Sequence, residues 1–165
     1  SHRNSLMKLE VIAVSNKLSN WENEGLNYYL KQFPKYVKFF SHEIRPYNSG
    51  GSIETIKNTE SASIANQLSK ESSYVIAFDR HGKTISSKEF ASFLSKVFSE
   101  HKKVSLVIGG SHGLNQKTLE SADTVISFSK LTLPHKLFRV VLIEQIYRAF
   151  AIIQNKPYHL SLIHI

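Results

Sequence analysis

The stretch Val104-Ser-Leu-Val-Ile-Gly-Gly-Ser-His-Gly113 decides the fold class of this chain. It opens with a short apolar run, typical of a strand that is buried on both faces, and the paired glycines end that run. Similar runs lie at 8–14, 74–78 and 124–128, and residues 36–44 largely alternate between apolar and polar side chains. Segments with helical spacing separate these strands, so the sequence predicts an α/β domain with a mainly parallel sheet flanked by helices. The helices are expected at 21–33, 53–70, 88–100, 114–121 and 136–154.

The composition limits the class of protein and the partners it can have. The chain has 165 residues, 41% of them hydrophobic, which suits one domain with a real core. It has no cysteine, which excludes disulfides, thiolate metal sites and a cysteine nucleophile. The 21 basic residues against 13 acidic ones give a net charge of +8, which favours a nucleic-acid partner. No apolar stretch approaches the roughly 20 residues of a membrane span, so we expect a cytoplasmic domain with no membrane partner.

Two glycine motifs could mark a phosphate or cofactor site. Gly82-Lys83-Thr84 resembles the end of a P-loop, but Ala77 holds the place of its first glycine, so a turn at Gly82 is the better interpretation. The glycines of 109–113 follow a buried strand, where ligands bind in open α/β sheets. They do not match G-x-G-x-x-G, and a structural turn between strand and helix explains them equally well.

The segment from Phe128 to His135 offers a second kind of binding loop. Its backbone groups could read the edge of an adenine, while Leu131 and Leu133 cover the face of the base. The alternative is a plain loop before a helix that Pro134 initiates.

The chain also carries charged and titratable candidates near its end. Glu144 and Arg148 stand four residues apart and can pair on one helix face, whereas Arg139 could simply face solvent. Tyr158 and His159 offer a proton donor or acceptor, unless they belong to a frayed end. His159 and His164 have no apparent third ligand, so no metal is expected.

Several of these segments occur together, and in order, in one known family. The segments are 7–14, Gly109-Gly110 after a strand, Leu131-Thr-Leu-Pro-His135, 139–150 and Pro157-Tyr-His159. Together they resemble the bacterial ribosomal RNA large subunit methyltransferase H family of the SPOUT class. The resemblance covers residues 7–159 as one domain and leaves 1–6 and 160–165 as expected expression remnants or disordered ends.

The resemblance implies a fold, a reaction and a site. The fold would contain a C-terminal trefoil knot, and the enzyme would be a homodimer. It would use S-adenosyl-L-methionine to methylate ring nitrogen 3 of a pseudouridine in 23S rRNA, on the assembled 70S ribosome. The matching cofactor-binding residues are Phe78, Gly109, Phe128, Ser129, Lys130, Leu131, Thr132 and Leu133.

The catalytic roles are hypotheses based on chemistry, because the ring N–H must lose its proton before it can attack a methyl group. Tyr158 and His159 are candidates for positioning and proton removal. Arg139 or Arg148 would stabilise charge on the ring, Glu144 would orient an arginine, and His135 is a further contributor. The sequence departs from the family at two positions. Relatives usually carry a lysine or arginine where Leu160 stands, and they often carry a histidine where Lys156 stands.

Two other functions stay open on the residues alone. One is a non-catalytic RNA- or ribosome-binding module that uses the same basic surface. The other is a SPOUT methyltransferase with a tRNA substrate.

Overall fold

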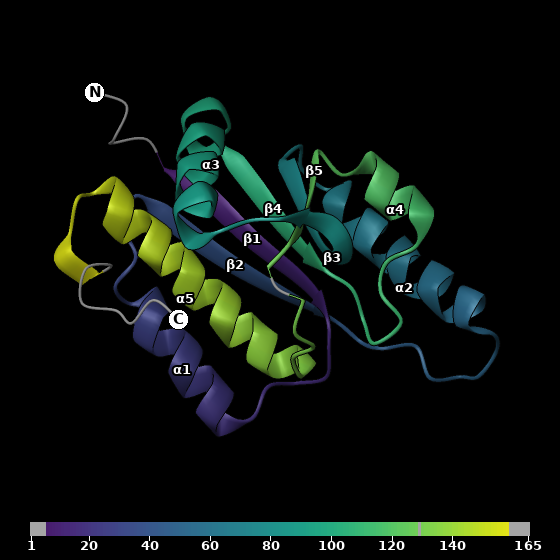
Figure 1. Cartoon of the computed structure of the whole chain (residues 1–165). Coiled ribbons are helices and arrows are strands. Elements are labelled where there is room, and N and C mark those ends of the chain that lie inside the picture. Colours follow the sequence, from purple (N-terminus) through teal and green to yellow (C-terminus); the bar gives the residue numbers. More distant parts are fainter. Residues whose placement is uncertain (1–5, 129, 159–165) are drawn as a thin grey trace.

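The computed structural model describes residues 6–128 and 130–158, and within them five strands form one sheet (Figure 1). The strand order is β2-β1-β4-β3-β5, and every neighbouring pair is parallel. The strands are β1 (Met7–Val14), β2 (Val37–Ile44), β3 (Tyr74–Thr84), β4 (Lys103–Ile108) and β5 (Thr124–Ser127). The helices are α1 (Asn20–Leu30), α2 (Ile53–Leu68), α3 (Ser87–Glu100), α4 (Gln116–Ser121) and α5 (His135–Ile153). The predicted α/β class is therefore confirmed.

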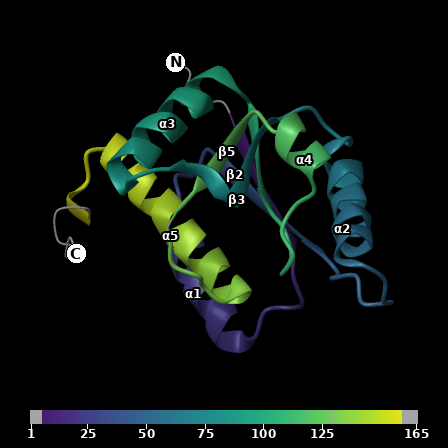
Figure 2. The same ribbon diagram turned by 45° about the vertical axis from the view of Figure 1, so that its right-hand side comes forward.

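Helices cover both faces of the sheet, as buried strands require. Figure 2 shows α1, α3 and α5 on one face and α2 and α4 on the other. The larger core lies on the first face, where Leu142, Ile146 and Phe150 of α5 pack against the sheet. A smaller core on the second face centres on Ile64 of α2 and Leu114. No helix in the described part of the chain has the length and apolar character needed to cross a bilayer.

Capping interactions fix where two helices begin. The Ser86 hydroxyl accepts the backbone N–H of Glu89 at 3.1 Å, and the Glu89 carboxylate accepts the N–H of Ser86 at 2.9 Å, as the S-x-x-E pattern predicts. That second bond lowers the pKa of Glu89. The N-cap of α1 is Ser19, which pairs with Glu22 in a second capping box, so the helix begins at Asn20, one residue before the predicted start.

Strand β3 is longer than the sequence predicts, and the turn expected at Gly82 is wrong. Phe78 pairs with Ile126 of β5, the next residues leave the ladder, and Lys83 then pairs with the same Ile126. Gly82 lies inside this extension, where an added Cβ would come within 2.8 Å of the Ile126 backbone. Real Cβ atoms do not approach backbone that closely, so the extension requires glycine at this position.

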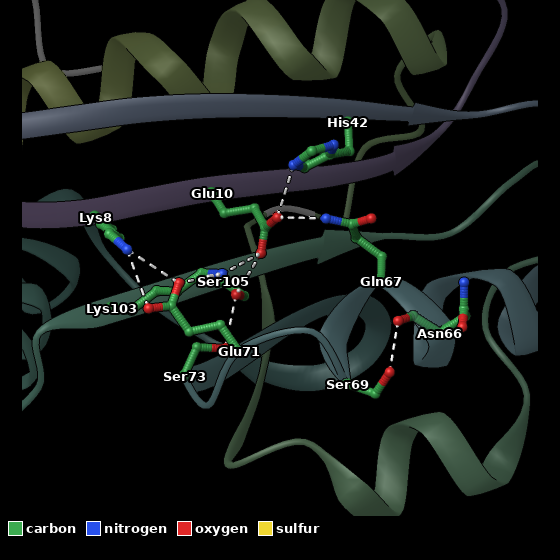
Figure 3. A network of polar contacts seen from close by, with 10 residues as sticks. All are labelled: Lys8, Glu10, His42, Asn66, Gln67, Ser69, Glu71, Ser73, Lys103 and Ser105. Carbon is green, nitrogen blue, oxygen red and sulfur yellow. Dashed lines mark hydrogen bonds and ion pairs between the residues drawn. The ribbon is translucent and has the colours of Figure 1, made fainter.

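A buried carboxylate ties α2 to three strands on the second face (Figure 3). Glu10 of β1 is only 2% exposed, and its Oε2 accepts bonds from His42 at 2.9 Å and Gln67 at 3.0 Å. Its Oε1 accepts a bond from Ser105 at 3.0 Å and lies 3.4 Å from the Lys103 ammonium. Every carboxylate oxygen thus has partners, which a buried charge needs.

The requirement for glycine at position 82, where the chain approaches the Ile126 backbone, can be tested by substitution. We expect Gly82→Ala to lower the free energy of unfolding by about 1–3 kcal/mol, because the new methyl group forces backbone apart. Gly25→Ala in α1 is the matched control, since its Cβ would meet only a Val140 methyl group at 3.2 Å. Urea denaturation monitored by circular dichroism measures both variants, and a Gly82→Ala variant as stable as wild type would contradict the proposed constraint.

Candidate cofactor and catalytic site

The parallel sheet brings the predicted cofactor residues to one edge. Phe78 of β3 stands beside Ile108 of β4 and Ile126 of β5 in the sheet register. Gly109 and Phe128 follow those two partners along the chain, so the ends of three neighbouring strands meet at the same carboxyl edge. Ligands of open α/β sheets bind at this edge. Ser129, which was also expected in the site, lies outside the described residues.

Four aromatic side chains pack together at this edge, and we call this cluster the aromatic floor. The Phe78 and Phe128 rings lie 5.1 Å apart, centroid to centroid, and Phe138 of α5 lies 5.8 and 5.6 Å from them. Phe90 of α3 packs against Phe128 at 5.0 Å. Phe78 is 8% exposed, so its ring belongs to the core at this edge. Phe90 and Phe138 were not predicted from the sequence, because only the fold brings α3 and α5 to this edge.

The loop above the floor carries the remaining predicted cofactor residues. Lys130 and Thr132 are exposed and Leu133 is half-buried. Leu131 is 77% exposed, the largest exposed fraction among the big apolar side chains that the structure describes. An apolar side chain presented in this way suits contact with the face of a ligand ring.

The glycine turn next to the loop is folded tightly on itself. An added Cβ at Gly109 would lie 2.8 Å from the backbone of Gly113, and Gly113 has a φ of +82°. The N–H of Gly113 donates to the carbonyl of Gly110 at 2.9 Å. The packing of the chain therefore requires glycine at 109 and 113. This agrees with the interpretation of the motif as a structural turn between strand and helix.

His135 connects the first turn of α5 to this glycine turn. Its Nε2 is hydrogen-bonded to the carbonyl oxygen of Gly109. Burial lowers the pKa of His135, so the ring is neutral at neutral pH. A carbonyl only accepts, so the proton sits on Nε2 and Nδ1 is a bare acceptor. The Nδ1 atom is buried and has no hydrogen-bond partner among the described residues.

Arg139 lies one turn further along α5, and the interpretation as a solvated residue is wrong. The side chain is 4% exposed. Its Nη1 donates to Glu43 of β2 at 2.7 Å, and its Nη2 donates to the Ser41 hydroxyl at 3.1 Å. These bonds hold α5 against the edge strand. The predicted role of Arg139 toward a substrate ring stays a prediction.

The later part of α5 gathers the other predicted catalytic residues. Arg148 pairs with Glu144 at 2.8 Å, which confirms the pairing expected from their spacing. The hydroxyl of Tyr158 donates to the same Glu144 oxygen at 2.9 Å. Burial and the Glu144 carboxylate raise the pKa of Tyr158, so it stays a phenol at neutral pH and donates a hydrogen bond. His159 lies outside the described residues.

The two groups of residues do not meet within one chain. Glu144 and Arg148 lie 9 and 13 residues beyond His135 on α5. At the rise of an α-helix these separations correspond to about 13 and 20 Å. The predicted site residues of one chain therefore fall into two half-sites, the predicted cofactor loop (130–133) before α5 and the Glu144–Arg148–Tyr158 cluster toward its end.

One buried residue beside the site was not identified from the sequence. Glu60 of α2 is 5% exposed, and an added Cβ at Gly110 would come within 2.7 Å of its Oε1. A signal was present, because Glu60 follows Ile56 and precedes Ile64 at four-residue spacing. A charged residue inside the apolar stripe of a helix has to find a partner.

Comparisons with known proteins agree on one family. The family described as "Predicted SPOUT methyltransferase" matches residues 7–159. The chain is 39% identical over 159 residues to the ribosomal RNA large subunit methyltransferase H of Carboxydothermus hydrogenoformans, covering 93% of this chain and 99% of that protein. It is 38% identical to the protein of that name from Janthinobacterium sp., with the same coverage. The one from Thermotoga sp. is also 38% identical, over 90% of this chain and 97% of that protein.

The half-buried ring of His135, whose pKa is lowered, predicts a pH dependence of stability. Its folded-state pKa is below the unfolded value, so the unfolded chain binds more protons and stability falls as pH drops below about 6.5. We expect His135→Gln to lose less stability than wild type between about pH 7.5 and about pH 5, because glutamine can still donate to Gly109. The exposed His112→Gln is the control, measured by urea denaturation at both pH values. An equal loss in wild type and His135→Gln would contradict this account.

Proposed function

The chain belongs to the SPOUT methyltransferase family, and we propose that it transfers a methyl group from S-adenosyl-L-methionine to ring nitrogen 3 of a pseudouridine in 23S rRNA. The observation that carries this proposal is the 39% identity across 99% of a relative named as a ribosomal RNA large subunit methyltransferase. The net charge of +8 supports it, because basic side chains neutralise RNA phosphates. The same membership implies the C-terminal trefoil knot of the SPOUT class.

The loop at the carboxyl edge is the proposed cofactor site. The exposed Leu131 and the half-buried Phe128, which packs on the buried Phe78, supply the apolar surfaces that an adenine ring needs. Lys130, Leu131 and Thr132 are exposed, and their backbone groups can supply hydrogen bonds to its edge. When bound, S-adenosylmethionine supplies an electrophilic methyl group on a sulfonium, and the transfer itself needs no metal.

The cluster toward the end of α5 is the proposed catalytic half-site. The ring N–H must lose its proton, and a nearby cation favours the resulting anion. Arg148 can supply that cation while Glu144 fixes both Arg148 and Tyr158. Tyr158 is protonated and therefore positions the base by donating a hydrogen bond. Proton removal is then left to His159, with His135 and Arg139 contributing at the cofactor side.

A homodimer would unite the two half-sites. Within one chain they lie about 13–20 Å apart along α5, which is too far for direct transfer. A second copy running in the opposite direction places its Glu144–Arg148–Tyr158 cluster over the cofactor loop of the first. The exposed Trp21 and Tyr28 of α1, at 57% and 56%, provide apolar surface beside α5 for such an interface.

The proposed substrate is the assembled 70S ribosome in the cytoplasm. Sequence-specific recognition of RNA usually targets loops whose bases can be splayed out. Docking of a small basic dimer at the interface between the two ribosomal subunits would then supply the sequence specificity that phosphate contacts lack.

Methyl transfer tests the substrate. With labelled S-adenosylmethionine, we expect label on 70S ribosomes that lack the modification, and none on free 23S rRNA or tRNA. Arg148→Ala should lower the rate by roughly a hundredfold, because it removes charge stabilisation. Label on tRNA would reassign the substrate within the family. No label on any RNA, despite cofactor binding, would favour the non-catalytic binding module.

Complementation tests the shared site. Leu131→Asp disables the cofactor loop and Arg148→Ala disables the cluster, so each homodimer should be inactive. Mixed dimers regain one intact site, and a random mixture should show about a quarter of the wild-type rate. A mixture that stays as inactive as the two separate variants would place both half-sites in one chain and contradict the dimeric site.

A further inference from the structure

A buried carboxylate oxygen beside Gly110 has no hydrogen-bond partner among the residues that the structure describes. Glu60 lies on α2, and its Oε2 accepts the backbone N–H of Tyr47 at 2.9 Å. Its Oε1 is also buried, yet it makes no hydrogen bond to any described residue. In Glu10, the other buried carboxylate described above, both oxygens accept hydrogen bonds. A buried acceptor without a donor is costly, so its retention calls for an explanation.

The unpartnered oxygen lies at the glycine turn of the proposed site. A Cβ on Gly110 would come within 2.7 Å of Glu60 Oε1, so only glycine leaves room for this oxygen against the turn. The neighbouring Gly109 carbonyl is bonded to His135, whose Nδ1 is the other buried acceptor without a described partner. The two groups therefore flank adjacent residues of the same turn, Glu60 at Gly110 and His135 at Gly109.

The chemistry of these two atoms selects a kind of ligand. The carboxylate oxygen and the bare ring nitrogen both accept hydrogen bonds, so neither satisfies the other. A group with several N–H donors and no acceptor satisfies both, and a positive charge on it strengthens the bond to the carboxylate. An alkylammonium group has these properties.

We propose that Glu60, together with Nδ1 of His135, forms a subsite for the α-ammonium group of the methionyl part of S-adenosylmethionine. This inference rests on the proposed function, because it takes the cofactor loop at 130–133 as the site of the adenosyl part. Glu60 then makes the pocket selective for adenosyl compounds that carry an amino acid over those that lack the amine.

Calorimetric binding to the full-length protein tests the subsite without relying on activity. The ligands are S-adenosylhomocysteine and its analogue in which hydrogen replaces the amino group. We expect wild type to prefer the amine by on the order of tenfold to a hundredfold, as for a charge-assisted hydrogen bond. Glu60→Gln should lose that preference while binding the deaminated analogue as wild type does. Glu54→Gln, an exposed change of the same kind in the first turn of α2, should keep the preference.

The outcomes separate this inference from the proposed function. Equal binding of both ligands by wild type overturns the subsite and leaves the cofactor site intact, and this comparison needs no variant to fold. A Glu60→Gln protein that retains the preference also overturns it. If wild type binds neither ligand, both the cofactor assignment and the subsite are overturned.

Discussion

The close contact between Gly82 and the backbone of β5 is the constraint on which the carboxyl edge of the sheet depends. It lets β3 leave the ladder after Phe78 and rejoin it at Lys83, beside the same residue of β5. The later part of β3 thereby stays paired with β5, the strand that leads to Phe128 of the aromatic floor and to the loop at 130–133. A second close contact, between Gly109 and Gly113, folds the neighbouring turn. Both contacts exclude a side chain, so the shape of the site is set mainly by backbone packing.

Polar groups buried on both faces hold the helices to this frame. On one face Glu10 binds Gln67 of α2, and on the other Arg139 of α5 binds Glu43 of β2. Such pairs contribute little net stability but are costly to break, so they fix one arrangement of helix against sheet. The orientation of α5 matters most, because it places His135 at the glycine turn and the Glu144–Arg148–Tyr158 cluster far from it.

The sequence predicted the elements well and the contacts between distant segments poorly. Apolar runs located four of the described strands and alternation located β2, and the S-x-x-E pattern of Ser86 and Glu89 marks the start of α3, because these signals are local. The turn expected at Gly82 was wrong, because its environment comes from β5, more than forty residues later. Arg139 looked solvated for the same reason, since its partner Glu43 lies on another element. Glu60 was missed although its place in an apolar stripe was visible.

The central claim is that an adenosyl cofactor binds at the carboxyl edge, between the glycine turn and the loop after β5. Titration of ¹⁵N-labelled protein with S-adenosylmethionine tests it residue by residue through amide chemical shifts. The account predicts the largest shifts at Gly109, Gly110 and 130–133, with Lys8 and Lys103 at the opposite edge unchanged. Shifts centred at that opposite edge, or none at saturating cofactor, would contradict it.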